Sequence, residues 1–299
     1  MLSKLFFKKF FNKSITNVTA AAALVAISSL ISRLLGVIRD RILAGSFGAG
    51  STLDIYYAAF RIPDLIFNLV VLGALSAGFI PIFSSLIKNK NNNKLENNKE
   101  AWLLASNILN FLFLGLAFLS IIGIIFSPQL TKLIAPGFSQ EEQLSTALLT
   151  RIMFLSPIFL GMSGVLGGIL QSFKRFVIYS LAPIFYNIGI IIGALFFVNF
   201  WGISGLAWGV VLGAFLHFII QIPSTLNLGF KYSLFLSWRD KKIRRIGKMM
   251  IPRTLSLAIS QINLVVITII ASSLPSGSLT AFNFANNLQS FPIGIFGIS

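Results

Sequence analysis

The 299-residue chain contains no cysteine, a single histidine and only eight acidic residues, and charged residues make up 11% of it. Without cysteine there is no disulfide, no thiolate metal site and no thiol nucleophile. The sequence also has no phosphate-binding glycine loop, no cluster of metal-ligand residues and no catalytic triad. We therefore expect neither a metal site, nor a cofactor, nor an enzyme such as an ATPase or a hydrolase.

The chain is instead rich in apolar residues. Hydrophobic residues make up 56% of it, and its mean hydropathy is +0.86. Apolar runs long enough to cross about 30 Å of hydrocarbon recur along the whole length. The prediction is an all-α polytopic membrane protein with about eight transmembrane helices, at residues 18–46, 54–87, 101–127, 143–171, 177–199, 203–227, 249–273 and 279–299.

The second of these spans is too long for a straight crossing. As one helix it would extend about 51 Å, well beyond the hydrocarbon thickness. We expect it to protrude, to tilt or to break, with Pro63 and Gly73 as the places for a break.

The net charge of +16 is distributed asymmetrically. Of the 24 lysines and arginines, 17 lie in the N-terminal segment and in alternate loops, only Lys132 lies in the opposite loops, and six arginines lie inside spans. This asymmetry follows the positive-inside rule and predicts a cytoplasmic N-terminus. We expect the basic loops to contact anionic phospholipids of the cytoplasmic leaflet, and we do not expect a nucleic-acid partner.

A weak internal repeat indicates two halves. Ile31-Ser32-Arg33 recurs as Ile259-Ser260-Gln261, and Leu53 and Ala59 align with Leu279 and Ala285. The expected organisation is an interfacial basic N-terminus (1–17), a six-helix lobe (18–228), a basic linker forming an amphipathic helix (229–248) and the first two helices of a second lobe (249–299). Since parallel six-helix repeats require twelve spans, we expect the chain to be part of a longer protein.

Arginines inside spans are the most informative residues. A charge at mid-bilayer costs about 2.5–3.5 kcal/mol on insertion scales, so it normally faces a cavity or a partner. Helical spacing places Arg33, Asp40 and Gly36 on one face of the first span, with Ser32 and Arg39 along its edge. The opposite face, expected to meet lipid, consists of Ile27, Ile31, Leu34 and Ile38. This pattern predicts a charged cavity that handles an anion.

The other arginines have more ordinary explanations. Arg61 follows Asp54 on a polar stripe of the second span and can pair with Asp64, so both a ligand contact and a structural ion pair stay open. Arg41, Arg151 and Arg253 lie near span ends, where snorkelling is routine. We expect His217 to be a core or interface histidine rather than a proton carrier, and the small-residue runs 161–168 and 202–213 to be sites of close helix packing.

Several segments together resemble a known family. SRLLGVIRD (32–40), FGAG (47–50), FRIPDL (60–65) and GALSAGFIPIF (73–83) resemble the N-terminal helices of the MurJ/MviN lipid II flippases. Later family segments are similar to APGF (135–138), APIFYNIG (182–189), SQIN (260–263) and SGSLTAFNFANNLQSFPIGIFGIS (276–299). The resemblance places the chain in the multidrug/oligosaccharidyl-lipid/polysaccharide exporter superfamily. It implies two six-helix lobes arranged as a V, of which this chain holds the first lobe and two helices of the second.

The resemblance also implies a function. It is export of lipid II, the undecaprenyl-pyrophosphate-linked peptidoglycan precursor, across the bacterial cytoplasmic (inner) membrane by alternating access. Arg33 and Arg39 match family arginines that line the central cavity and are implicated in holding the pyrophosphate, and Asp40 and Asp54 fall on acidic positions of the family pattern. Asn287 stands where relatives carry an arginine, as does the pair Phe67-Asn68.

The predicted substrate-binding set consists of Ser32, Arg33, Arg39, Asp40, Asp54, Arg61 and Asn287. Two alternatives remain to the lipid II flippase. One is an exporter of another polyprenyl-linked glycan or amphiphile of the same superfamily, and the other is a membrane scaffold that no longer transports.

Overall fold

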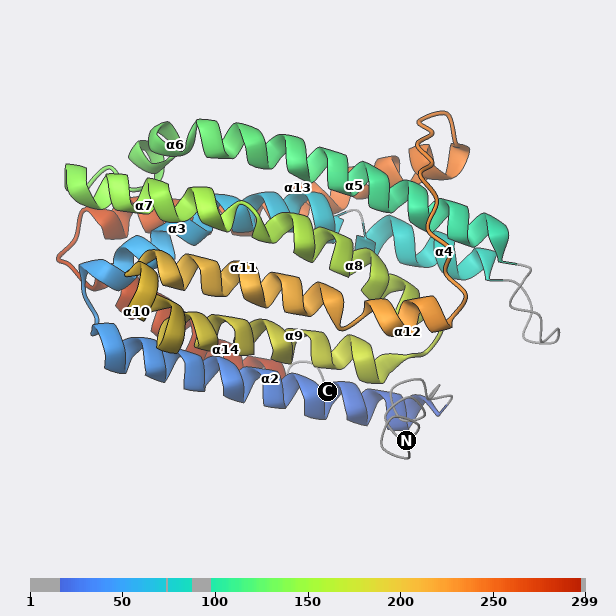
Figure 1. The fold of residues 1–299 in the computed structure, drawn as a ribbon, viewed down its shortest axis with the longest axis horizontal. Helices are drawn as coiled ribbons and strands as arrows, with labels where there is room; N and C mark the ends of the chain where they lie inside the picture. Colours follow the sequence, from blue (N-terminus) through green and yellow to red (C-terminus); the bar gives the residue numbers. More distant parts are fainter. Residues whose placement is uncertain (1–16, 74, 88–97, 297–299) are drawn as a thin grey trace.

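The computed structural model describes residues 17–73, 75–87 and 98–296, and these residues form helices with no strand among them (Figure 1). The predicted all-α fold is confirmed. Residues 1–16 of the predicted interfacial N-terminus (1–17) lie outside the described residues, as do residues 88–97. The helices are α2 (Val18–Phe47), α3 (Ser51–Phe67), α4 (Ile80–Leu86), α5 (Lys99–Ile125), α6 (Ser127–Ile134), α7 (Gln140–Met153), α8 (Ser156–Ser172), α9 (Phe176–Ile192), α10 (Val198–Trp201), α11 (Ser204–Ile219), α12 (Ile222–Asn227), α13 (Lys241–Ser272) and α14 (Ser278–Phe296).

Seven helical segments of the described chain are long and apolar enough to cross a membrane. They begin at Thr19, Ser51, Lys99, Gln140, Phe176, Ser204 and Lys241 and coincide with the first seven predicted spans. The eighth predicted span, 279–299, coincides with helix α14 but is not among the seven. Its sequence explains the difference, because Asn283, Asn286, Asn287 and Gln289 interrupt the apolar run.

The helices lie side by side, most of them along the long axis of the molecule (Figure 1). Helix α9 packs between α2 and α11, α11 packs on α8, and α8 packs on α5. Helix α3 packs on α7, so the first six spans form one interconnected bundle. Helices α13 and α14 lie against α2, α3 and the segment that follows α3.

Helix α11 illustrates how small residues permit this packing. A Cβ atom on Gly209 would lie 2.6 Å from the Cα atom of Gly193, and one on Gly213 would lie 2.4 Å from the carbonyl oxygen of Tyr186. One turn after Gly213, His217 Nδ1 lies 2.6 Å from Ser163 Oγ of α8. The predicted close packing around 202–213 is confirmed, and the histidine lies partly buried at the interface between α11 and α8.

The long second span is interrupted near Gly73. Pro63 lies inside the continuous helix α3, whereas the chain widens into two π-helical segments, η1 (Asn68–Leu72) and η2 (Leu75–Phe79), on either side of Gly73. Helix α13 packs here, and the Thr254 hydroxyl donates a hydrogen bond of 3.0 Å to the Leu69 carbonyl. A Cβ on Gly73 would lie 2.3 Å from Thr254 Oγ1, so the glycine permits this approach.

The linker between the sixth and seventh spans differs from the prediction. Residues 230–240 are not helical, and only 241–248 are, as the first turns of α13. The amphipathic helix predicted over 229–248 is therefore wrong for its first half. The cause lies on α5, where the Asn107 side chain bonds both the N–H (3.0 Å) and the carbonyl (3.3 Å) of Ser237. The Asp240 carboxylate then accepts from the Lys242 N–H at 2.8 Å and caps α13.

Candidate functional site: a charged cavity between α2, α9 and α14

A cavity of about 230 Å³ lies where α2, α9 and α14 meet. Five of the seven predicted site residues line it. The described lining contains predicted site residues and others, and consists of Ser32, Arg33, Gly36, Val37, Arg39, Asp40, Asn187, Asn287 and Ser290. The charged cluster of α2 and Asn287 of α14 are thus brought into one space.

Helix α2 places its charges there by its periodicity. Ile27, Ile31, Leu34 and Ile38 are all exposed, as expected for a face that meets lipid. Arg33, Arg39 and Asp40 are partly buried. The predicted division of α2 into an apolar outer face and a charged inner face is confirmed.

Arg39 and Asp40 form the core of a hydrogen-bond network that joins the three helices. Arg39 donates from Nε (2.9 Å) and Nη2 (2.8 Å) to Asp40 Oδ1, and from Nη1 (3.2 Å) to Asn187 Oδ1 on α9. The other oxygen of Asp40 accepts from Asn287 Nδ2 on α14 at 2.9 Å. The charge of Arg39 is therefore balanced by its neighbour in this state.

Arg33 carries an unbalanced charge. Its Nη1 donates to the backbone carbonyl of Ser290 on α14 at 2.5 Å. Within the described ranges the ion pairs are Arg39–Asp40 and Lys242–Glu100, and neither involves Arg33. Two guanidinium groups and one carboxylate give the cavity a net charge of +1, with Arg33 as the cation that a carboxylate does not neutralise.

Asn187 is the site residue that sequence reasoning missed. Its Nδ2 donates to the carbonyl and to the hydroxyl of Ser32 at 3.3 Å, while its Oδ1 receives Arg39. The available signal was a polar residue inside the APIFYNIG segment of an apolar helix. Ser290 contributes its backbone carbonyl, and a backbone group cannot be predicted from the pattern of side chains.

Asp54 lies outside this cavity. The carboxylate is buried and accepts hydrogen bonds from the N–H of Gly277 (2.6 Å), the N–H of Thr280 (2.7 Å) and the hydroxyl of Thr280 (2.6 Å). These groups belong to the start of α14, whose first N–H groups have no partner within the helix. Asp54 thus caps α14 from α3.

Arg61 also contacts the second-half helices rather than the cavity. It donates to Thr268 Oγ1 on α13 (2.7 Å) and to Asn283 Oδ1 on α14 (2.8 Å). The ion pair with Asp64, one of the two alternatives for Arg61, is not among those formed by the described residues. Arg61 joins α3 to both helices of the second half.

Comparison with known proteins shows the family to which this architecture belongs. A family model described as "Lipid II flippase MurJ" matches residues 43–299. A probable lipid II flippase MurJ of Buchnera aphidicola subsp. Acyrthosiphon pisum is 35% identical over 280 residues, covering 92% of this chain and 53% of that protein. The lipid II flippase MurJ of Burkholderia cenocepacia is 30% identical over 287 residues, covering 93% of this chain and 54% of that protein.

A solved structure described as lipid II flippase MurJ in an inward closed conformation is similar in fold. Its TM-score is 0.75 at 28% sequence identity, and the match covers 93% of this chain and 56% of that one. The chain spans about half the length of the curated relatives it matches. The resemblance first indicated by SRLLGVIRD and FRIPDL is confirmed, and the chain belongs to the MurJ family of lipid II flippases.

Proposed function

We propose that the protein containing this sequence is a transporter that moves lipid II across the bacterial cytoplasmic membrane by alternating access. The observation that carries the proposal is Arg33, a guanidinium held in an intramembrane cavity without a carboxylate partner. Placing a charge inside the membrane costs free energy, and charged residues found there often mark substrate pathways. The family relationship supports an anionic lipid-linked cargo as the substrate class.

The chemistry of the cavity suits a pyrophosphate. A guanidinium presents donors in a planar fork that matches phosphate oxygens, and it loses less hydration energy than an ammonium group when it leaves water. Arg33 would give up its bond to the Ser290 carbonyl for a charged acceptor. Asn187 keeps the second guanidinium, that of Arg39, directed at the same space.

The size of the cavity implies a conformational cycle. Its volume of about 230 Å³ is below the roughly 300–1,000 Å³ of sites for drug-sized ligands, and a glycopeptide headgroup is larger still. Helices α2 and α14 must therefore separate before cargo enters. Two hydrogen bonds join the two helices in this structure, one from Arg33 to the Ser290 carbonyl and one from Asn287 to Asp40. An anion that competes for Arg33 would break the first of them.

We further propose that the N-terminus lies in the cytoplasm, that residues 18–228 and 249–299 belong to two lobes, and that the basic loops contact anionic phospholipids. The orientation rests on the 17 basic residues on one side against Lys132 on the other. Single cysteines can test it in this cysteine-free chain. We expect Arg239→Cys to react only from the cytoplasm and Ser276→Cys only from outside, and reaction of both from one side would contradict the topology.

The test of the function is rescue of a bacterium depleted of its own lipid II flippase by the native gene carrying this sequence. Restored growth and cell shape would support the proposal. Asn287 and Phe67-Asn68, neutral where relatives carry cations, favour one alternative, an exporter of another polyprenyl-linked glycan. Failure to rescue despite normal abundance in the membrane would favour that exporter or a transport-inactive scaffold.

A further inference from the structure

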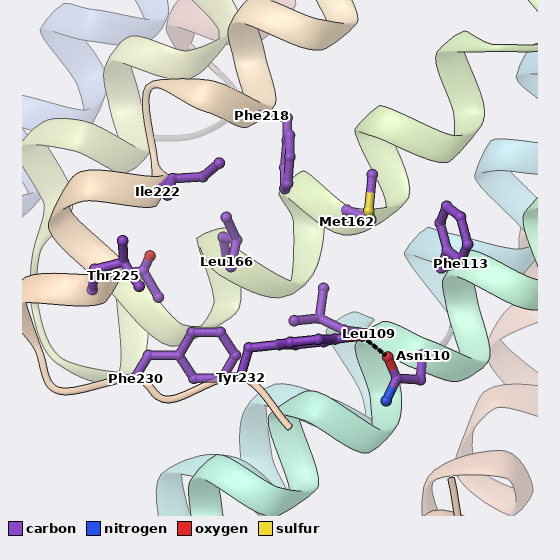
Figure 2. Close-up of a pocket in the computed structure, with 11 residues that line it drawn as sticks. Leu109, Asn110, Phe113, Met162, Leu166, Phe218, Ile222, Thr225, Phe230 and Tyr232 are labelled. Carbon is purple, nitrogen blue, oxygen red and sulfur yellow. Dashed lines mark hydrogen bonds between the residues drawn. The ribbon is translucent and has the colours of Figure 1, made fainter. Parts of the chain in front are cut away.

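A second cavity, of about 360 Å³, shares no lining residue with the charged site (Figure 2). Its walls come from α5, α8, the end of α11 and α12, and the extended chain that follows α12 closes one edge. Its apolar lining includes Leu109, Phe113, Met162, Leu166, Phe218 and Ile222, and none of the described residues that line it is charged. The volume falls within the range of ordinary ligand sites.

The cavity has a buried floor and an open rim. Leu109, Leu166 and Phe230 are buried, whereas Phe113 and Tyr232 are 45% and 56% exposed. One polar contact lies at the edge, where the Tyr232 hydroxyl donates to Asn110 Oδ1 at 2.7 Å (Figure 2). A slender apolar chain can thus enter past the exposed rim without leaving a polar group of the protein unpaired.

Cations surround this end of the bundle. Lys231 is exposed and stands between Phe230 and Tyr232, two residues of the cavity lining. Phe173 and Phe230 both pack on Trp102, with ring centroids 5.5 and 5.6 Å away. The Lys174-Arg175 turn that follows Phe173 therefore lies at the same end as Phe230.

Arg175 adds a second, independent observation. Its Nε atom is buried and has no hydrogen-bond partner among the described residues. An unpaired buried guanidinium donor is costly, and an acidic headgroup oxygen would satisfy it. An apolar cavity at the end of the bundle that also carries these three cations, one of them with an unused donor, matches a molecule with an apolar tail and an anionic head.

We propose that this cavity holds one acyl chain of an anionic phospholipid, with the phosphate between Lys231 and Arg175. The composition of the 230–238 segment suits a membrane interface, since it carries Lys231 together with exposed Leu234 and Trp238, and Arg239 follows it. The bound lipid would cover the cavity beneath this segment, which leads directly into α13. The proposal is independent of the cargo of the charged site.

The experiment uses the purified native protein in nanodiscs that contain phosphatidylglycerol or phosphatidylcholine with a photoreactive diazirine near the end of one acyl chain. Cross-linked peptides are then identified by mass spectrometry. We expect phosphatidylglycerol to label the segments around Phe113, Met162 and Phe218, several-fold more than phosphatidylcholine does. Met162→Trp fills the cavity and should lower this labelling at least fivefold. Leu148→Trp, an exposed position of the same predicted span, is the matched control and should leave it unchanged.

A charge variant tests the headgroup separately. Lys231→Glu should reduce the preference for phosphatidylglycerol about fivefold or more, the effect expected from losing one basic residue at an anionic surface. Lys132→Glu, exposed at the opposite end of the bundle, should not change it. Melting temperatures of the variants exclude loss of fold as the cause.

Three results would overturn the proposal. The first is equal labelling of wild type and Met162→Trp, and the second is equal labelling by the two lipids. The third is stronger labelling of the same residues by a photoreactive polyprenyl phosphate that displaces phosphatidylglycerol, which would make the occupant a prenyl chain.

Discussion

Substitutions in the Arg39–Asp40 ion pair can separate its contribution to stability from its contribution to cargo binding. The two side chains are only 19% and 12% exposed, and Arg39 gives Asp40 Oδ1 two hydrogen bonds. Arg39→Ala leaves Asp40 with its bond from Asn287. Removing one partner of a buried pair costs about 3–5 kcal/mol, and the remaining amide bond places this case at about 3 kcal/mol.

The second variant adds Asp40→Asn to Arg39→Ala. It removes the carboxylate that Arg39→Ala leaves without an ion-pair partner, so most of the lost free energy of unfolding should be recovered. Transport should not return, because the cavity then keeps Arg33 as its single guanidinium. Asp40→Asn alone is the matched control, since it retains both guanidinium groups.

Melting in detergent, followed by tryptophan fluorescence, measures the stability of the three variants, and complementation of a flippase-depleted strain measures transport. The expected result is a low melting temperature for Arg39→Ala, near recovery for the double variant, and no growth with either. If the double variant restored growth, Arg39 would serve only to neutralise Asp40. If Arg39→Ala melted like the wild type, the assignment of a buried structural pair would be wrong.

Four further substitutions test individual contacts. Asp54→Ala should cost about 2–3 kcal/mol, measured by melting, because it leaves buried N–H groups at the start of α14 unpaired. Gly209→Val should abolish stable accumulation, since the new Cβ would meet backbone atoms of Gly193 and Gly189, whereas Gly115→Val, with open space around its Cβ, should be tolerated. Arg61→Gln should lower the melting temperature and reduce growth only as far as it reduces abundance, and a transport defect at normal abundance would return Arg61 to the cargo-binding set. Asn287→Arg should bind Asp40, free Arg39 and raise the affinity for undecaprenyl pyrophosphate about tenfold in native mass spectrometry, and an unchanged affinity would contradict this role.

Properties that depend on one helix at a time could be predicted from the sequence. Hydropathy located the seven apolar spans because a bilayer imposes a minimum length on each. The 3.6-residue period of α2 put Arg33 and Asp40 opposite Ile31 and Ile38, and the structure confirms that division. The cavity therefore contains most of the predicted cluster.

Properties that depend on which helices meet could not be predicted in the same way. Asp54 and Arg61 share a polar stripe with Asp64, and their spacing favoured a local pair or a ligand contact. Their actual partners, among them Thr280 and Thr268, lie more than 200 residues away on helices whose position the sequence does not give. The extended 230–240 segment was missed for the same reason, because α5 supplies its hydrogen bonds.

The central claim is that Arg33 and Arg39 hold a pyrophosphate inside the membrane. Native mass spectrometry can test it directly by comparing the affinities of the native protein for undecaprenyl pyrophosphate, undecaprenyl phosphate and undecaprenol. These three ligands share one tail and differ only in the charge of the head. We expect affinity to fall in that order by about tenfold or more per step, and Arg33→Ala to remove most of the difference while Arg33→Lys retains part of it. Equal affinities for the three ligands, or an unchanged order in Arg33→Ala, would contradict the account.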